Sequence, residues 1–214
     1  ISKAVKDGLI EKNPFSDESI PKNVWADRSK IFYIGQEDCQ RIWNVLNTEE
    51  DKLRFVLMRF LGVRSPSEIN ELNWSDFNWT TGVVKIRSPK LIRHPRKYQR
   101  VCPFFHDLAL PTIKAAYERR SSDYENILPK ISHKNLTKHV RGWLGAAGIK
   151  PWPRLLNNFR SSAAIDFHAA YDILSACAFM GHSERIAKEH YHKTHAGHIA
   201  DVVKVKPRKC RASS

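Results

Sequence analysis

Long apolar runs and paired cysteines are missing from this sequence of 214 residues. No segment approaches the roughly 20 apolar residues that a membrane-spanning helix needs, and no signal-peptide pattern opens the chain. Cysteines stand only at Cys39, Cys102, Cys177 and Cys210, and no two are close enough in sequence to suggest a zinc motif or a disulfide framework. We therefore expect a cytoplasmic protein with no membrane segment, in a reducing environment.

Acidic residues are also in the minority. The chain has 36 Lys and Arg against 22 Asp and Glu, which gives a net charge of +14 and a pI near 9.8. Such an excess indicates a polyanionic partner, with nucleic acid as the first candidate and a membrane surface as the second. The hydrophobic fraction of 42% is enough for one large core, or for one domain with an appendage.

The two ends of the chain differ from its middle. Residues 1–14 read as the end of a helix closed by Asn13-Pro14, and residues 15–30 are polar without sustained periodicity, which is typical of a linker. The chain starts at Ile1 rather than at methionine, so we expect residues 1–14 to end an upstream domain. Residues 31–196 form the main domain, and residues 197–214 form a basic tail with a small valine patch.

The middle of the chain predicts an α+β fold that is mainly helical. In the helix expected after Thr48, apolar residues recur at the spacing of one buried stripe, and this helix ends at Gly62. Three short segments read as strands of a small antiparallel sheet, with a turn at Thr81-Gly82. The expected helices are 36–46, 49–61, 106–120, 132–147, 157–169, 172–179 and 183–191, and the expected strands are 74–79, 83–87 and 100–104.

Several residues in this framework suit phosphoryl transfer. Tyr191 lies among histidines and lysines, whose positive charge favours a nucleophilic phenolate and could hold the phosphate that it attacks. Arg64 and Arg160 lie where apolar helices meet turns, and Lys90 follows a strand. Each also has a plainer interpretation. Tyr191 is then a packing aromatic, the arginines are surface charges, and Lys90 is one cation of the basic loop 88–99, with Lys85, Arg93 and Lys97 as its rivals.

Taken in order, short motifs resemble the catalytic domain of tyrosine recombinases, the phage-integrase family, over roughly residues 31–191. The segment 62–76, with Gly62-Val63-Arg64, looks like the box around the first catalytic arginine, and Lys90 stands where the hairpin lysine of the family is expected. Asn157-Asn158-Phe159-Arg160 looks like the family's His-x-x-Arg box. Met180-Gly181-His182-Ser183 looks like its Leu-Gly-His motif, and Tyr191 follows at the spacing of the nucleophile.

This resemblance implies the tyrosine-recombinase catalytic-domain fold and a site-specific recombinase or integrase that cleaves and rejoins double-stranded DNA through a 3'-phosphotyrosyl link, with no metal and no cofactor. The chain also departs from the family pattern in two places. Asn157 stands in place of an ionisable histidine, and Arg64 is one residue further from Glu68 than in the family's usual box. The resemblance further implies self-association as a tetramer on DNA, although an isolated fragment could be monomeric. The implied catalytic residues are Arg64, Lys90, Asn157, Arg160, His182 and Tyr191, and the implied DNA-binding residues of the loop are Arg93, Arg96 and Lys97.

Three alternatives stay open. A type IB topoisomerase or a telomere resolvase shares the chemistry, and a DNA-binding module descended from a recombinase would be inactive, for which Asn157 is the sequence hint. The histidines His182, His190, His192, His195 and His198 suggest a metal site. However, His190, His192 and His195 do not have the i, i+4 spacing of a helical zinc pair, and we expect no metal there.

Overall fold

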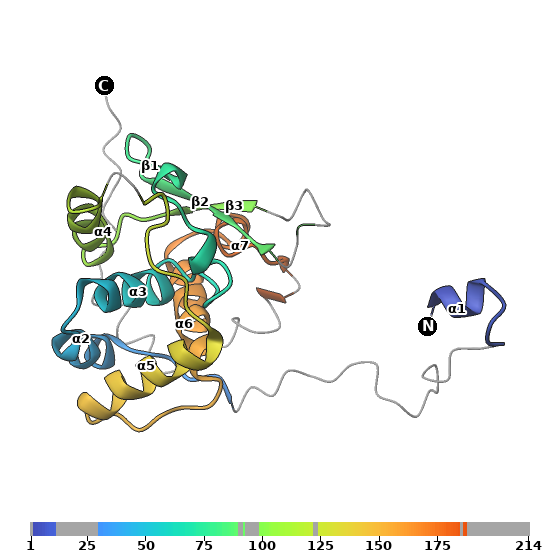
Figure 1. Ribbon diagram of the computed structural model, residues 1–214, viewed down its shortest axis with the longest axis horizontal. Helices are drawn as coiled ribbons and strands as arrows, with labels where there is room; N and C mark the ends of the chain where they lie inside the picture. The colour runs from blue at the N-terminus through green and yellow to red at the C-terminus, as the bar shows by residue number, and fades with distance from the viewer. Residues whose placement is uncertain are drawn as a thin grey trace.

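The structure, a computed structural model, describes residues 2–11, 30–89, 92, 99–121, 124–184 and 186–187. Within these residues, a small sheet lies at one edge of a mainly helical domain (Figure 1). The helices are α1 (Ser2–Lys6), α2 (Gln36–Val45), α3 (Glu49–Arg59), α4 (Ala109–Glu118), α5 (His133–Ala146), α6 (Leu155–Ala170) and α7 (Ile173–Met180), and the strands are β1 (Phe77–Asn78), β2 (Val83–Arg87) and β3 (Gln99–Pro103).

Helix α3 forms the middle of the fold. It begins at the predicted cap, where the Thr48 hydroxyl accepts a hydrogen bond from the backbone N–H of Asp51 at 3.1 Å. Every residue from Leu53 to Arg59 is buried, because α3 packs against both α4 and α6. In Figure 1, α4 and the sheet lie on one side of α3, and α2 and α5 lie on the other. The predicted apolar stripe is therefore confirmed as core.

The sheet is antiparallel with the order β1-β2-β3, as the sequence predicts. Val84 and Ile86 of β2 are buried between exposed or half-buried neighbours, which is the alternation of a strand with one face on the core. The first predicted strand is shorter than expected, since residues Trp74–Asp76 form a 3-10 turn. The Asp76 carboxylate accepts from the backbone N–H of Asn73 at 2.9 Å, and this capping box favours the turn.

Helix α6 begins two residues earlier than predicted, at Leu155, so Arg160 lies in its second turn rather than its first. Phe159, Ala163, Ala164 and Phe167 are buried and form the inner face of this helix.

Helix α7 then begins at Asp172, whose carboxylate caps the backbone N–H groups of Leu174 and Ser175. It ends at Gly181, which has a φ of +63°. The backbone N–H of His182 donates to the carbonyl of Cys177 at 3.2 Å, which closes a Schellman motif. This motif sets the direction in which the chain leaves α7 at His182.

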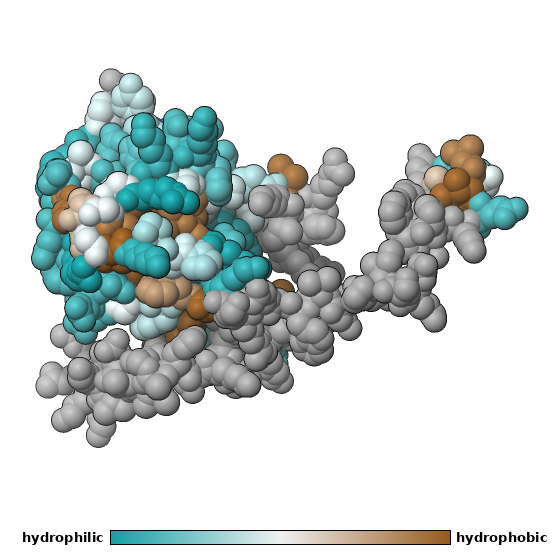
Figure 2. All heavy atoms as spheres, turned by 90° about the horizontal axis from the view of Figure 1, so that it is seen from below, coloured by the Kyte–Doolittle hydropathy of each residue, from teal (hydrophilic) through white to brown (hydrophobic). Residues whose placement is uncertain are grey.

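Hydrophilic residues make up most of the described surface in Figure 2, with apolar residues showing between them. No helix among the described residues is long and apolar enough to cross a membrane. Apart from Lys30, the predicted linker 15–30 lies outside the described residues, and so does the predicted tail 197–214.

Candidate active site

A buried carboxylate, that of Glu68, organises the candidate site. Its side chain is fully buried and accepts a hydrogen bond from the backbone N–H of Arg64 at 2.9 Å. It also accepts from two guanidinium groups, from Arg64 Nη1 at 2.5 Å and from Arg100 Nη1 at 3.0 Å, and Nη1 of Arg160 lies 3.9 Å away. We call Glu68, Arg64, Arg100 and Arg160 the Glu68 cluster. It joins the turn after α3, strand β3 and helix α6.

Close approach of these segments depends on Gly62. Its φ is +59°, a conformation that residues with a side chain rarely adopt. A Cβ atom there would lie 2.8 Å from Met180 Cε and 3.1 Å from Ala163 Cβ, so no larger residue fits without a shift of its neighbours. The Gly62 carbonyl also accepts hydrogen bonds from Arg160 and from Arg100. Gly62 therefore lets α3 deliver Arg64 against α6 and α7.

The charges of the Glu68 cluster favour the ionised form of the Glu68 carboxylate, and the cluster as a whole has a net positive charge. Burial by itself would raise the pKa of Glu68, but the charges of Arg100, Arg64 and Arg160 outweigh it and the pKa is lowered. Burial lowers the pKa of Arg100, although Glu68 opposes this change. Because three guanidinium groups share one carboxylate, the site carries a net positive charge suited to an anion.

The arginines of the cluster differ in exposure. The Arg64 side chain is 31% exposed and also donates to the Ser88 hydroxyl at 3.3 Å, whereas the Arg100 side chain is only 6% exposed. Arg100 Nε donates to the Phe179 carbonyl at 2.8 Å, which fastens β3 to the end of α7. Arg64 is therefore more accessible to solvent than Arg100. Arg100 is buried and holds the Glu68 carboxylate in place.

His182 lies beside the same cluster. Arg160 donates to the carbonyl of Met180, two residues before His182, so α6 fixes the turn that carries the imidazole. The His182 side chain is half-buried, and burial, with His168, Arg160 and Arg64 also contributing, lowers its pKa to about 4. His182 is thus neutral at pH 7 and can donate a hydrogen bond from one ring nitrogen. The structure brings Arg64 and Arg160 together at Glu68, and His182 lies near enough for both charges to act on it.

Other predicted site residues are not all placed. Lys90, Arg93, Arg96, Lys97 and Tyr191 lie outside the described residues. Asn157 is exposed on α6, one turn before Arg160 and therefore on the same side of the helix. Its neighbour Asn158 is buried, and the side-chain amide of Asn158 donates hydrogen bonds to the backbone carbonyls of Lys30 and Pro153.

Sequence reasoning missed two members of the cluster. Glu68 appeared only as part of a motif, although its i, i+4 spacing from Arg64 is a signal for an ion pair. Arg100 appeared only as the first residue of a strand. No sequence spacing connects Arg100 to Glu68, because β3 comes 32 residues later and reaches the cluster through sheet pairing. Together these groups can hold a tetrahedral oxyanion such as phosphate between guanidinium and imidazole donors.

Several solved structures share this fold. The crystal structure of XerA recombinase is 15% identical over 83% of this chain and 66% of that chain, with a TM-score of 0.65. A structure of the Tn1549 transposon integrase in complex with circular intermediate DNA is 14% identical over 95% of this chain and 75% of that chain, also with a TM-score of 0.65. A lambda integrase dimer bound to a COC' core site is 17% identical over 90% of this chain and 55% of that chain, with a TM-score of 0.61.

These likenesses show the fold: the chain has the catalytic-domain fold of tyrosine recombinases, as the ordered motifs predict. It spans less than two thirds of the XerA and lambda integrase chains. No protein-family model and no curated protein sequence matches this chain.

Proposed function

We propose that this protein is a site-specific DNA recombinase or integrase that breaks and rejoins DNA through a 3'-phosphotyrosyl intermediate on Tyr191. The observation that supports this most is the meeting of Arg64, Arg160 and His182 at the Glu68 cluster. These residues are far apart in sequence, and each has the chemistry that a scissile phosphate requires.

The two arginines neutralise the non-bridging oxygens of the phosphate. A planar guanidinium offers paired N–H donors that match two oxygens, and Glu68 holds the group in place so that little side-chain entropy is lost on binding. His182, neutral at pH 7, donates a hydrogen bond to a phosphate oxygen. Asn157 lies on the same side of α6 as Arg160 and adds a donor of fixed protonation.

Tyr191 supplies the nucleophile in this scheme. Its phenolate oxygen attacks the scissile phosphorus, the bond to the 5'-oxygen breaks, and Lys90 gives that oxygen a proton, leaving a 5'-hydroxyl. The phosphotyrosyl bond keeps the energy of the broken phosphodiester, so the reverse attack by a 5'-hydroxyl rejoins the strand. The reaction needs no nucleotide cofactor, because no net bond energy is lost.

Double-stranded DNA is the proposed partner. The net charge of +14 favours binding to its phosphates, and the loop residues Arg93, Arg96 and Lys97 extend the contact along the backbone. The Tn1549 integrase and lambda integrase structures contain DNA, which agrees with this choice of partner. Recombination of two duplexes further implies assembly of four copies on DNA.

Nicked suicide substrates test the proposal. On such DNA the strand beyond the break diffuses away, so the covalent intermediate accumulates and appears as a shifted protein band in denaturing electrophoresis. We expect the band with the wild-type chain and not with Tyr191→Phe or Arg160→Ala. Salt-sensitive DNA binding by the full-length protein with no band on any substrate would contradict the enzymatic proposal and favour an inactive DNA-binding module.

A further inference from the structure

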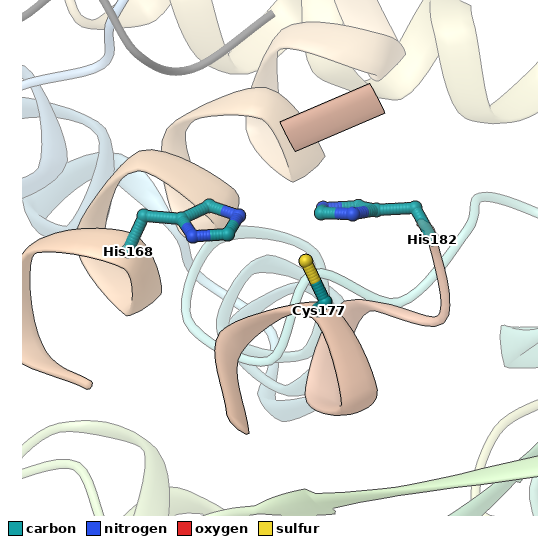
Figure 3. A group of neighbouring side chains, drawn as sticks. All are labelled: His168, Cys177 and His182. Carbon is teal, nitrogen blue, oxygen red and sulfur yellow. The ribbon is translucent and has the colours of Figure 1, made fainter. Parts of the chain in front are cut away.

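Three potential metal ligands meet beside the Glu68 cluster. His168 lies in the last turn of α6, Cys177 lies on α7, and His182 follows the end of α7. One ligand atom from each lies within 4.8 Å of the other two. Figure 3 shows the two imidazole rings pointing toward each other, with the Cys177 sulfur beneath the space between them.

The spacing of these groups is close to that of a metal site. With bonds of about 2.0 to 2.1 Å to nitrogen and 2.3 Å to sulfur, tetrahedral geometry separates the ligand atoms by about 3.3 to 3.6 Å. The observed limit of 4.8 Å shortens to this range if each ligand atom moves by less than about 1 Å, which small side-chain rotations supply. The two rings are already nearly parallel, with centroids 5.4 Å apart and an interplanar angle of 25°.

The chemistry of the three groups also fits. Cys177 is a free, buried thiol, and its sulfur becomes a ligand when a metal displaces the proton. His168 and His182 are imidazoles, the side chains that most commonly bind metals in proteins.

We propose that His168, Cys177 and His182 form a binding site for a thiophilic divalent cation of the Zn²⁺ class. Two imidazoles and one thiolate are a set that selects zinc or cobalt over magnesium or calcium. His168 and His182 are half-buried as residues, but ring nitrogens of both are buried from solvent. Bound metal would join the end of α6 to the end of α7 and hold the His182 ring.

This site uses His182 but none of the histidines from His190 onward. No sequence spacing indicates the three-residue set, because the ligands lie nine and five residues apart and meet only when α6 folds back on α7. The metal-site proposal also does not depend on the proposed recombinase activity, so an experiment can refute either proposal without refuting the other.

Titration of the full chain with Co²⁺ tests the site. A thiolate bound to Co²⁺ gives a charge-transfer absorption band, and we expect one equivalent of this band, displaced by Zn²⁺. His168→Gln should weaken metal binding by at least about 10-fold, and Cys177→Ser should abolish the band. The matched control is Cys210→Ser, which removes the tail thiol and should leave the band unchanged.

Thermal unfolding gives a second readout. Because metal binds the folded chain, Zn²⁺ should raise the melting temperature of the wild type and not that of His168→Gln. His168 is half-buried at a helix end, so its replacement should leave the apo protein folded. A band that persists in Cys177→Ser, or that disappears in Cys210→Ser, would overturn the proposal.

Discussion

Replacement of Glu68 by glutamine should destabilise the domain strongly. The Glu68 carboxylate is fully buried and accepts hydrogen bonds from Arg64 and Arg100, and Nη1 of Arg160 lies 3.9 Å from it. The amide of glutamine keeps the shape of the side chain, but it carries no charge and turns an N–H₂ group toward guanidinium donors. Removal of one partner from a buried ion pair costs about 3 to 5 kcal/mol, because the remaining charges stay desolvated.

Urea unfolding measures this loss. With an m-value of about 2.5 kcal/mol/M, a loss of 3 to 5 kcal/mol lowers the urea midpoint by about 1 to 2 M. The matched control is Glu71→Gln, since Glu71 pairs with Lys130 at 3.6 Å on the surface, where both side chains are largely exposed. That variant should change the free energy of unfolding by less than about 1 kcal/mol.

The pH dependence gives an independent check of the same reasoning. The pKa of Glu68 is lower in the folded chain, so its stabilising contribution is fully present above the unfolded value of about 4.3 and is lost as the pH falls through the folded value. The difference in stability between wild type and Glu68→Gln should therefore narrow at acid pH. A loss below about 1 kcal/mol at pH 7, equal to that of Glu71→Gln, would refute the role given to Glu68.

Three further predictions follow from the site and its supports. Arg64→Ala should reduce covalent DNA cleavage by about 10² to 10³-fold, and Arg64→Lys should recover only part of it, because lysine lacks the paired donors; equal activity of Arg64→Lys and wild type in single-turnover assays would contradict this. Gly62→Ala should destabilise the domain by about 2 kcal/mol or more in urea unfolding, since φ is +59° and Met180 Cε would lie 2.8 Å from the new Cβ. The control is Gly142→Ala, at an exposed helical position with open space around it, which should be neutral or stabilising. Burial lowers the pKa of His106, so the free energy of unfolding should fall as the pH drops below about 6.5, and this slope should flatten in His106→Asn.

Much of the fold could be predicted from local patterns. Strand β2 has its predicted bounds, and the start of α3 after Thr48 is confirmed by a hydrogen bond from the backbone N–H of Asp51 to the Thr48 hydroxyl. The first strand was predicted too long because local side-chain hydrogen bonds compete with strand formation there. The segment Trp74–Asp76 has the aromatic composition of a strand, but the reciprocal bonds of Asn73 and Asp76 favour a 3-10 turn there.

The candidate site was predictable only in part. Arg64, Arg160 and His182 could be identified because motifs in a fixed order carry them, and the structure places them at one cluster. Arg100 and Cys177 could not, since their partners depend on how β3 and α7 pack against α6 and the turn after α3. Contacts between distant segments leave no periodic signal in the sequence, so three-dimensional packing is needed to reveal them.

The most direct test of the proposed chemistry is to identify the residue that carries DNA in the trapped complex. The suicide-substrate adduct would be digested with protease and nuclease, and the peptide bearing a nucleotide would be sequenced by mass spectrometry. We expect the nucleotide on Tyr191, linked through a 3'-phosphate. A nucleotide on another residue such as Tyr171, a 5'-phosphate link, or an adduct that persists in Tyr191→Phe would contradict the account.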